Sequence, residues 1–193
     1  MDLQQQPQRF QPAVMPKIGL LISLLMVCVV GFSQKTKLVE WSATERLALK
    51  DFKIVVTDSL SDHCGLAYYI NLTGGPFFSL GKKDFNQSVS NLMSPTISWI
   101  DTNYQVVGQI RFMQTVFDIS EIYARLLRKS LTEKNSNSSK ARRLAQETYI
   151  PQFVVRKDKY EKETKAGTLL AKQLEWEQTI AKELEALKAF AKE

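Results

Sequence analysis

The stretch Gln109-Ile-Arg-Phe-Met-Gln-Thr-Val-Phe-Asp-Ile-Ser-Glu-Ile-Tyr-Ala-Arg125 decides the fold. Its apolar side chains recur every three to four residues, which is the spacing of one face of an α-helix. The positions that share this face are Phe112, Val116, Ile119, Tyr123 and Leu126. We therefore predict one long helix over residues 104–131, with this apolar stripe packed into the core.

The segments on either side of this helix differ in character. Before it, strand-forming residues and turn residues alternate, and strands are predicted at 53–56, 66–72, 77–80, 89–93 and 96–100. After it, helical patterns cover 141–149 and 168–191, with Pro151 expected to end the first of them and a loop at 135–139. An N-terminal antiparallel β-sheet followed by a long helix and C-terminal helices is an α+β fold.

Composition indicates one globular domain. The chain has 193 residues, of which 44% are hydrophobic, and this suits a single domain over residues 34–193. The formal net charge is +6. Lysines alternate with glutamates along the C-terminal third, as on a solvated helix face, and no compact basic patch contains aromatic residues. Nucleic acid is therefore not expected as a partner.

The N-terminus has the pattern of a targeting segment. An apolar run covers 18–32, with Lys17 before it and Ser33 at its end. It is shorter than the roughly 20 residues of a membrane span and matches the apolar part of a signal peptide. We predict a signal peptide at 1–33, export to the periplasm or the extracellular space, and a translation start at Met15. The alternative is an uncleaved inner-membrane anchor.

Cysteine and histidine are scarce. The two cysteines are Cys28, inside the leader, and Cys64, so the mature chain cannot form an internal disulfide. The single histidine, His63, precedes Cys64, and neighbours in sequence rarely point at each other. We interpret this pair as a loop or strand edge without chemistry. Ser59, Ser61 and Asp62 lie too close in sequence to His63 to favour a catalytic triad.

Several segments together resemble a bacterial family of secreted zinc-dependent proteases, long catalogued as a domain of unknown function. The matching residues extend in order over most of the chain after the leader: Trp41-Ser42, Leu47, Asp51-Phe52-Lys53, Ser98-Trp99, Gln114, Phe117-Asp118-Ile119, Tyr123-Ala-Arg125, Leu127-Arg128, Tyr160, Thr164, Gly167, Gln173 and Trp176. The resemblance implies a single zincin-like α+β domain, in which the long helix would correspond to the metal-binding helix.

The zinc chemistry of that family is missing. Its helix carries His-Glu-x-x-His, whose two histidines bind one zinc ion while the glutamate polarises the attacking water. These three positions correspond to Phe112, Met113 and Val116, and a downstream histidine corresponds to Ala166. Phe, Val and Ala have no donor atom, and a thioether is a poor ligand for catalytic zinc. We call these four the vacated metal-site positions and expect neither a metal nor another cofactor.

The flanks of the motif are kept. They are Trp41, Phe117, Asp118, Tyr123, Arg125, Thr164 and Gly167. Asp118 is expected to have a supporting or structural role. Together with Glu121 and Arg125 it is expected to form ion pairs on the helix surface, without a catalytic function.

These observations predict an exported pseudo-metalloprotease. It would bind a peptide or an envelope protein in the former substrate cleft without cutting it. One alternative is an active hydrolase or peptidase with an unconventional site around His63, Asp118 and Glu121. The other is a structural envelope protein anchored in the membrane by its N-terminal segment.

Overall fold

The computed structural model describes residues 37–56, 63–72, 89–133 and 138–192. All of them belong to one compact unit, Thr36–Glu193. The predicted leader at 1–33, the start at Met15, the strand at 77–80 and the residues Ser59, Ser61 and Asp62 lie outside the described residues.

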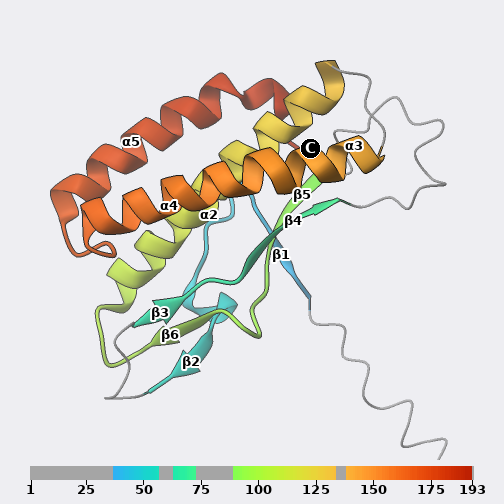
Figure 1. Cartoon of the computed structure of the whole chain (residues 1–193). Coiled ribbons are helices and arrows are strands. Elements are labelled where there is room, and N and C mark those ends of the chain that lie inside the picture. Colours follow the sequence, from blue (N-terminus) through green and yellow to red (C-terminus); the bar gives the residue numbers. More distant parts are fainter. Residues whose placement is uncertain (1–36, 57–62, 73–88, 134–137, 193) are drawn as a thin grey trace, which may run out of the picture. The chain divides into compact units, whose positions relative to one another are not determined.

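The described strands form two three-stranded sheets (Figure 1). In the first, β1 (Val39–Glu40), β5 (Val89–Met93) and β4 (Tyr68–Leu72) lie in the order β1-β5-β4 and pair antiparallel. In the second, β2 (Lys53–Val55) runs parallel to β6 (Trp99–Asp101), and β3 (Cys64–Gly65) runs antiparallel to β6. The α+β class is confirmed. The antiparallel pattern holds for the first sheet, whereas the second sheet is mixed.

The C-terminal half is helical. The long helix α2 (Val106–Glu133) confirms the prediction for 104–131 to within two residues at each end. It is followed by α3 (Ser138–Leu144), a π-helical segment η3 (Ala145–Tyr149), α4 (Ile150–Thr164) and α5 (Leu170–Ala186). Short 3-10 turns, η1 (Leu49–Asp51) and η4 (Lys188–Phe190), complete the described elements. The predicted helix at 168–191 corresponds to α5 and η4.

The interpretation of Pro151 as a helix end was wrong. Pro151 lies in the first turn of α4, where its missing N–H has no intrahelical partner to lose and its fixed φ suits the helix. The π-helical segment η3 precedes it, so the helical backbone runs on from α3 into α4. Residues 138 and 139 of the predicted loop are helical, and residues 135–137 lie outside the described part of the chain.

Two strand predictions were too long. The segment 66–72 contributes only β4, while the residues just before it form β3 in the other sheet. The segment 96–100 begins as a turn, closed by the hydrogen bond from the Ser98 N–H to the Ser94 carbonyl at 3.0 Å, and becomes a strand only at Trp99. Pro95 lies inside this turn and favours it.

Helix α2 lies at the centre of the described unit. Both α4 and α5 pack along it and against each other, and strands of both sheets contact it (Figure 1). Every residue from 112 to 125 is buried, which only a helix covered on all sides can achieve. The predicted stripe is confirmed as core, with Phe112, Val116, Ile119 and Tyr123 buried and Leu126 half-buried against them.

In the part of the chain that the structure describes, no helix combines the length and the apolar character needed to cross a bilayer.

Candidate functional site

The vacated positions on α2 are deep in the core. Phe112 and Val116 lie one turn apart on the same helix face and are 7% and 3% exposed. Met113 lies on the neighbouring face, is 1% exposed and belongs to the same hydrophobic cluster. All three side chains are apolar, so their burial leaves no donor or acceptor without a partner.

The fourth position lies in the turn between α4 and α5. Lys165, Ala166 and Gly167 all have positive φ, at 48°, 52° and 83°. The Thr164 hydroxyl holds this turn, because its Oγ1 accepts the Gly167 N–H at 3.1 Å and donates to the Tyr160 carbonyl at 2.8 Å. Three successive left-handed residues are costly for side chains other than glycine, so the turn depends on these hydrogen bonds.

The turn places Gly167 directly against Phe112. A Cβ atom built on Gly167 would lie 2.8 Å from the Phe112 Cβ, closer than van der Waals contact allows. Ala166, the exposed neighbour of Gly167, is therefore brought to the same end of α2 as Phe112. Positions 112 and 166, which are far apart in sequence, lie in one region of the fold.

Aromatic side chains fill this region. The Tyr160 ring stacks on Phe112 with a centroid distance of 5.2 Å and an interplanar angle of 14°. Trp176 meets Tyr160 edge-on at 5.4 Å. Such pairs stabilise a core by about 0.5–1.5 kcal/mol beyond the burial of their area. The helices α2, α4 and α5 are thus joined by three rings around Phe112.

A series of side-chain hydrogen bonds starts at the hydroxyl of one of these rings, Tyr160. The Tyr160 hydroxyl donates to Gln173 Oε1 at 2.6 Å, and Gln173 Nε2 donates to Thr115 Oγ1 and to Glu177 Oε1, each at 2.8 Å. Arg111 donates to both Glu177 oxygens at 2.6 Å. Burial raises the pKa of Tyr160. Burial also acts to raise the pKa of Glu177, but hydrogen bonds from Arg111 and Gln173 outweigh it and hold that pKa below its ordinary value.

The side chains around Phe112 are not a set of metal ligands of the kind that zinc prefers. Within the described ranges, no group of three or more histidine, cysteine, aspartate or glutamate side chains is placed to hold a metal ion. The region around Phe112 contains aromatic rings, a phenol, an amide and a paired carboxylate. Such groups stabilise packing and position helices.

Asp118 ties the N-terminal segment to α2. Its carboxylate accepts from Trp41 Nε1 at 2.8 Å, from Gln114 Nε2 at 2.9 Å and from two nitrogens of Arg46 at 3.1 and 2.5 Å. Gln114 in turn accepts the Leu47 N–H at 2.7 Å. The retained flank residues Trp41 and Asp118 therefore bind each other across the fold, which agrees with a structural role.

Glu121 and Arg125 do not form a surface ion pair, and that prediction was wrong. Glu121 is 2% exposed and accepts from Arg125 at 3.1 Å and from Arg128, itself 2% exposed, at 2.7 Å. The excess positive charge is balanced by carbonyls at helix ends, where the helix dipole is negative. Arg125 donates to the Leu184 carbonyl at 2.6 Å and Arg128 to the Phe190 carbonyl at 3.1 Å.

The remaining flank residues also have packing roles. Phe117 is 1% exposed, and its carbonyl accepts from Asn91 Nδ2 at 3.2 Å. Tyr123 meets Phe153 of α4 edge-on at 6.0 Å. Each of them connects α2 to a different neighbour.

His63 lies apart from these residues. Its Nδ1 is 3.5 Å from Asp101 Oδ2, and its ring stacks on Tyr104 at 3.9 Å. Cys64 pairs through the backbone with Ile100 in the second sheet. Among the described contacts, His63, Asp118 and Glu121 have three separate sets of partners, so the fold does not assemble the alternative hydrolase constellation.

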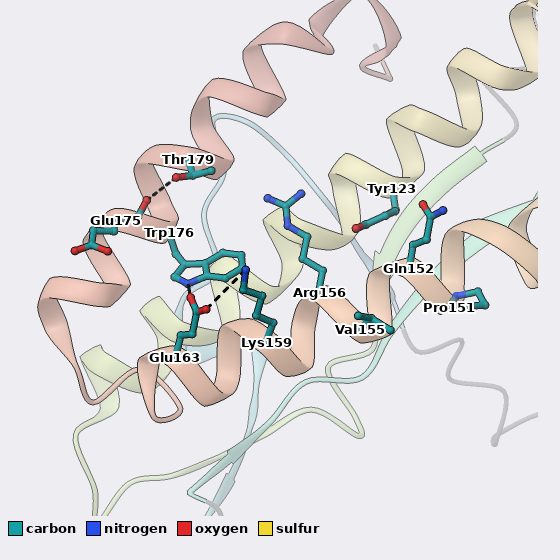
Figure 2. Close-up of a pocket in the computed structure, with 10 residues that line it drawn as sticks. All are labelled: Tyr123, Pro151, Gln152, Val155, Arg156, Lys159, Glu163, Glu175, Trp176 and Thr179. Atoms are coloured by element: carbon teal, nitrogen blue, oxygen red, sulfur yellow. Dashed lines mark hydrogen bonds and ion pairs between the residues drawn. The ribbon is translucent and has the colours of Figure 1, made fainter.

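A groove between α4 and α5 was not predicted, because α4 itself was not predicted. It has a volume of about 770 Å³, and Figure 2 shows Arg156 between the neighbouring Trp176 and Lys159 on one side and Tyr123 of α2 on the other. Arg156 and Lys159 lie 5.7 and 6.0 Å from the Trp176 ring centroid. Both cations have acidic partners, Glu183 at 2.6 Å and Glu163 at 3.8 Å, so the groove has little uncompensated charge.

No family model matches the chain, and no curated protein or solved structure is significantly similar to it. The class that the structure defines is an α+β unit built around one central helix, which is buried throughout residues 112–125.

Proposed function

We propose that this protein is an exported, non-catalytic homologue of the secreted zinc-dependent proteases, and that it binds a peptide or an envelope protein instead of cutting it. The observation that carries this proposal is the contact between Gly167 and Phe112. The resemblance assigns metal ligands to position 112 and to the residue before Gly167. Phe112 is buried and touches Gly167, and the exposed Ala166 is the residue before that contact, so both assigned positions have apolar side chains in one region of the fold.

The packing around Phe112 supports this proposal. A buried site with only some of its ligands leaves polar groups without partners, which costs several kcal/mol. Here Phe112, Met113 and Val116 are all apolar and join one hydrophobic cluster. The Tyr160 ring covers Phe112. Replacement of all the assigned zinc ligands by apolar residues supports the proposal that the protein is selected for its fold and for binding.

Metal analysis of the purified full chain tests the loss of zinc binding. After dialysis against buffer that contains zinc and then against metal-free buffer, we expect much less than stoichiometric zinc by mass spectrometry. Zinc retained in stoichiometric amount would refute the proposal, because the vacated positions offer no donor for it.

Restoring the ligands tests whether these positions once formed a metal site. We expect the variant Phe112→His/Met113→Glu/Val116→His/Ala166→His to bind zinc, because two histidines at i and i+4 and a third from the turn reach one ion. The matched control is Gln178→His/Lys182→His, an i, i+4 pair on the exposed face of α5. The restored site should bind at least about tenfold more tightly than the control, which offers two ligands.

The zinc affinity of the fourfold variant can be interpreted only if this variant folds like the wild type. If the fourfold variant does not give the circular dichroism of the wild type, Met113→Glu/Val116→His/Ala166→His is used, which keeps three donor side chains and leaves Phe112 and its stacking partner in place. A folded variant that binds zinc no better than the exposed pair would contradict the assignment of these positions.

Export is tested separately by fractionation and N-terminal sequencing. We expect a chain that begins at Gln34 in the soluble periplasmic or extracellular pool. A chain that keeps residues 1–33 and sediments with membranes would instead support the anchored alternative.

A further inference from the structure

Among the described strands, β1 has a neighbour on one side only, and we call its other side the open edge. It is the terminal strand of its sheet, and Val39 pairs with Met93 while the Trp41 N–H donates to the Asn91 carbonyl at 2.9 Å. In antiparallel pairing, successive residues direct their backbone groups to opposite edges. The N–H and C=O of Glu40 therefore point away from β5, and no described residue forms a backbone hydrogen bond with them.

This edge borders a groove of about 1160 Å³. One wall is the segment 37–47, the other is α2 through Gln114, Phe117 and Arg125, and Lys192 lines one end. The Arg125 guanidinium lies 5.0 Å from the Trp41 ring centroid. At 100° per residue, Gln114, Phe117 and Arg125 lie on the side of α2 opposite to Phe112 and Val116. The groove is therefore separate from the vacated metal site.

Five cationic residues line the groove, Lys37, Arg46, Lys50, Arg125 and Lys192, together with three acidic ones, Glu40, Glu45 and Asp51. Arg46 and Arg125 are paired with Asp118 and Glu121 of α2, so they add no free charge to the groove. Lys192 pairs with Glu40 at 2.6 Å, and the Asp51 carboxylate accepts the Ala48 N–H. Lys37 and Lys50 are exposed and form no ion pair with any described residue.

We propose that this groove binds an extended acidic peptide, which adds a strand to the open edge of β1. The peptide backbone would pair with the free N–H and C=O of Glu40, and its carboxylates would meet Lys37 and Lys50. Strand addition obtains affinity from main-chain hydrogen bonds and selectivity from alternate side chains. This inference rests on the proposed function only in taking the partner to be a peptide, and it moves the binding site to another face of α2.

Fluorescence polarisation of labelled peptides with the full chain tests the proposal. The probe is a blocked heptapeptide of alternating valine and glutamate. One comparison peptide has lysine in place of glutamate, and two others have N-methyl groups on one or the other set of alternate residues. We expect the acidic peptide to bind about tenfold more tightly than the lysine peptide. One N-methylated peptide should lose binding, because its methyl groups block the hydrogen bonds to the β1 edge.

Two charge-reversal variants locate the site. In Lys37→Glu/Lys50→Glu the preference should reverse, with the lysine peptide binding more tightly. The matched control Lys162→Glu/Lys182→Glu makes the same charge change at exposed lysines of α4 and α5, outside the groove, and should keep the wild-type preference.

Three results would overturn the proposal: no binding of the acidic peptide to the wild type, unchanged preference in Lys37→Glu/Lys50→Glu, or equal binding of both N-methylated peptides and the parent. Because zinc content is measured independently, these results would remove the groove assignment and leave the loss of the metal site standing.

Discussion

Gly167 has two independent reasons to lack a side chain. Its φ of 83° lies in the left-handed region, and the space that a Cβ would need is occupied by Phe112. Gly108 offers a contrast within the same fold. It lies inside α2, and the nearest atom to a Cβ built there is a Gln105 side-chain oxygen at 3.7 Å, which is ordinary contact.

The substitution Gly167→Ala should destabilise the protein by about 1–3 kcal/mol, from backbone strain and from overpacking against Phe112. The control Gly108→Ala should stabilise it by about 0.5–1 kcal/mol, because alanine loses less backbone entropy in a helix. Urea unfolding followed by circular dichroism measures both. A neutral Gly167→Ala would show that the turn does not press against α2.

At the scale of elements, a connected series of side-chain hydrogen bonds joins α2 to α5. Arg111 and Thr115 of α2 contact Glu177 and Gln173 of α5, and Gln173 also receives the Tyr160 hydroxyl of α4. Glu177 is the charged acceptor in this chain of contacts, and its side chain is 28% exposed. Its protonation therefore affects how firmly the two helices hold each other.

The lowered pKa of Glu177 predicts a stability that depends on pH. A group with a depressed pKa in the folded state stabilises it above its unfolded pKa, here near 4.5, and loses that contribution as the pH falls through the folded value. Glu177→Gln should therefore cost up to about 1 kcal/mol near neutral pH, a value reduced by solvent screening, and progressively less in acid below pH 4.5. Urea unfolding across this pH range measures the difference.

The control for this prediction is Glu175→Gln, whose partner Lys172 forms an exposed pair with it on α5. It should change the unfolding free energy by less than about 0.5 kcal/mol at any of these pH values. A Glu177→Gln variant with the same pH dependence as the wild type would mean that the Arg111 contact does not persist in solution.

At the scale of the whole described unit, one buried helix connects all the layers. The N-terminal segment reaches α2 through Trp41 and Asp118, strand β6 packs on it, and α5 binds it through Gln173. A tryptophan lies in each of these regions, namely Trp41, Trp99 and Trp176. Because all three regions pack against α2, none of them would keep its core contacts if it separated from this helix.

We therefore expect one cooperative unfolding transition. Three variants, each with two of the tryptophans replaced by phenylalanine, report on the three regions by fluorescence. In each variant the fluorescence midpoint should coincide with the midpoint of that variant's own far-ultraviolet circular dichroism. An earlier midpoint for Trp41 alone would show that the N-terminal segment separates from α2 before the helices unfold.

Local patterns predicted the elements that depend on local forces. The period of the apolar residues located α2, and alternating strand formers located β2 and β5. The helix α4 was not predicted, because Pro151 is equally compatible with a helix end and a helix start. In the structure the π-helical segment η3 leads directly into α4, so Pro151 lies at a helix start. The burial of Arg128 and Glu121 was also hidden, since a charged residue on a helix is usually solvated.

By itself, the sequence determined that positions 112, 113, 116 and 166 carry no imidazole, thiolate or carboxylate for zinc, because ligand chemistry is a property of each side chain. It also determined a long helix with an apolar stripe. Only the tertiary structure decided that Gly167 contacts Phe112 and that Asp118 accepts a hydrogen bond from Trp41. It also decided that, within the described ranges, no strand pairs with the outer edge of β1 and no acidic group pairs with Lys37 or Lys50. These contacts join residues far apart in the chain, and they form only when packing brings several elements together at once.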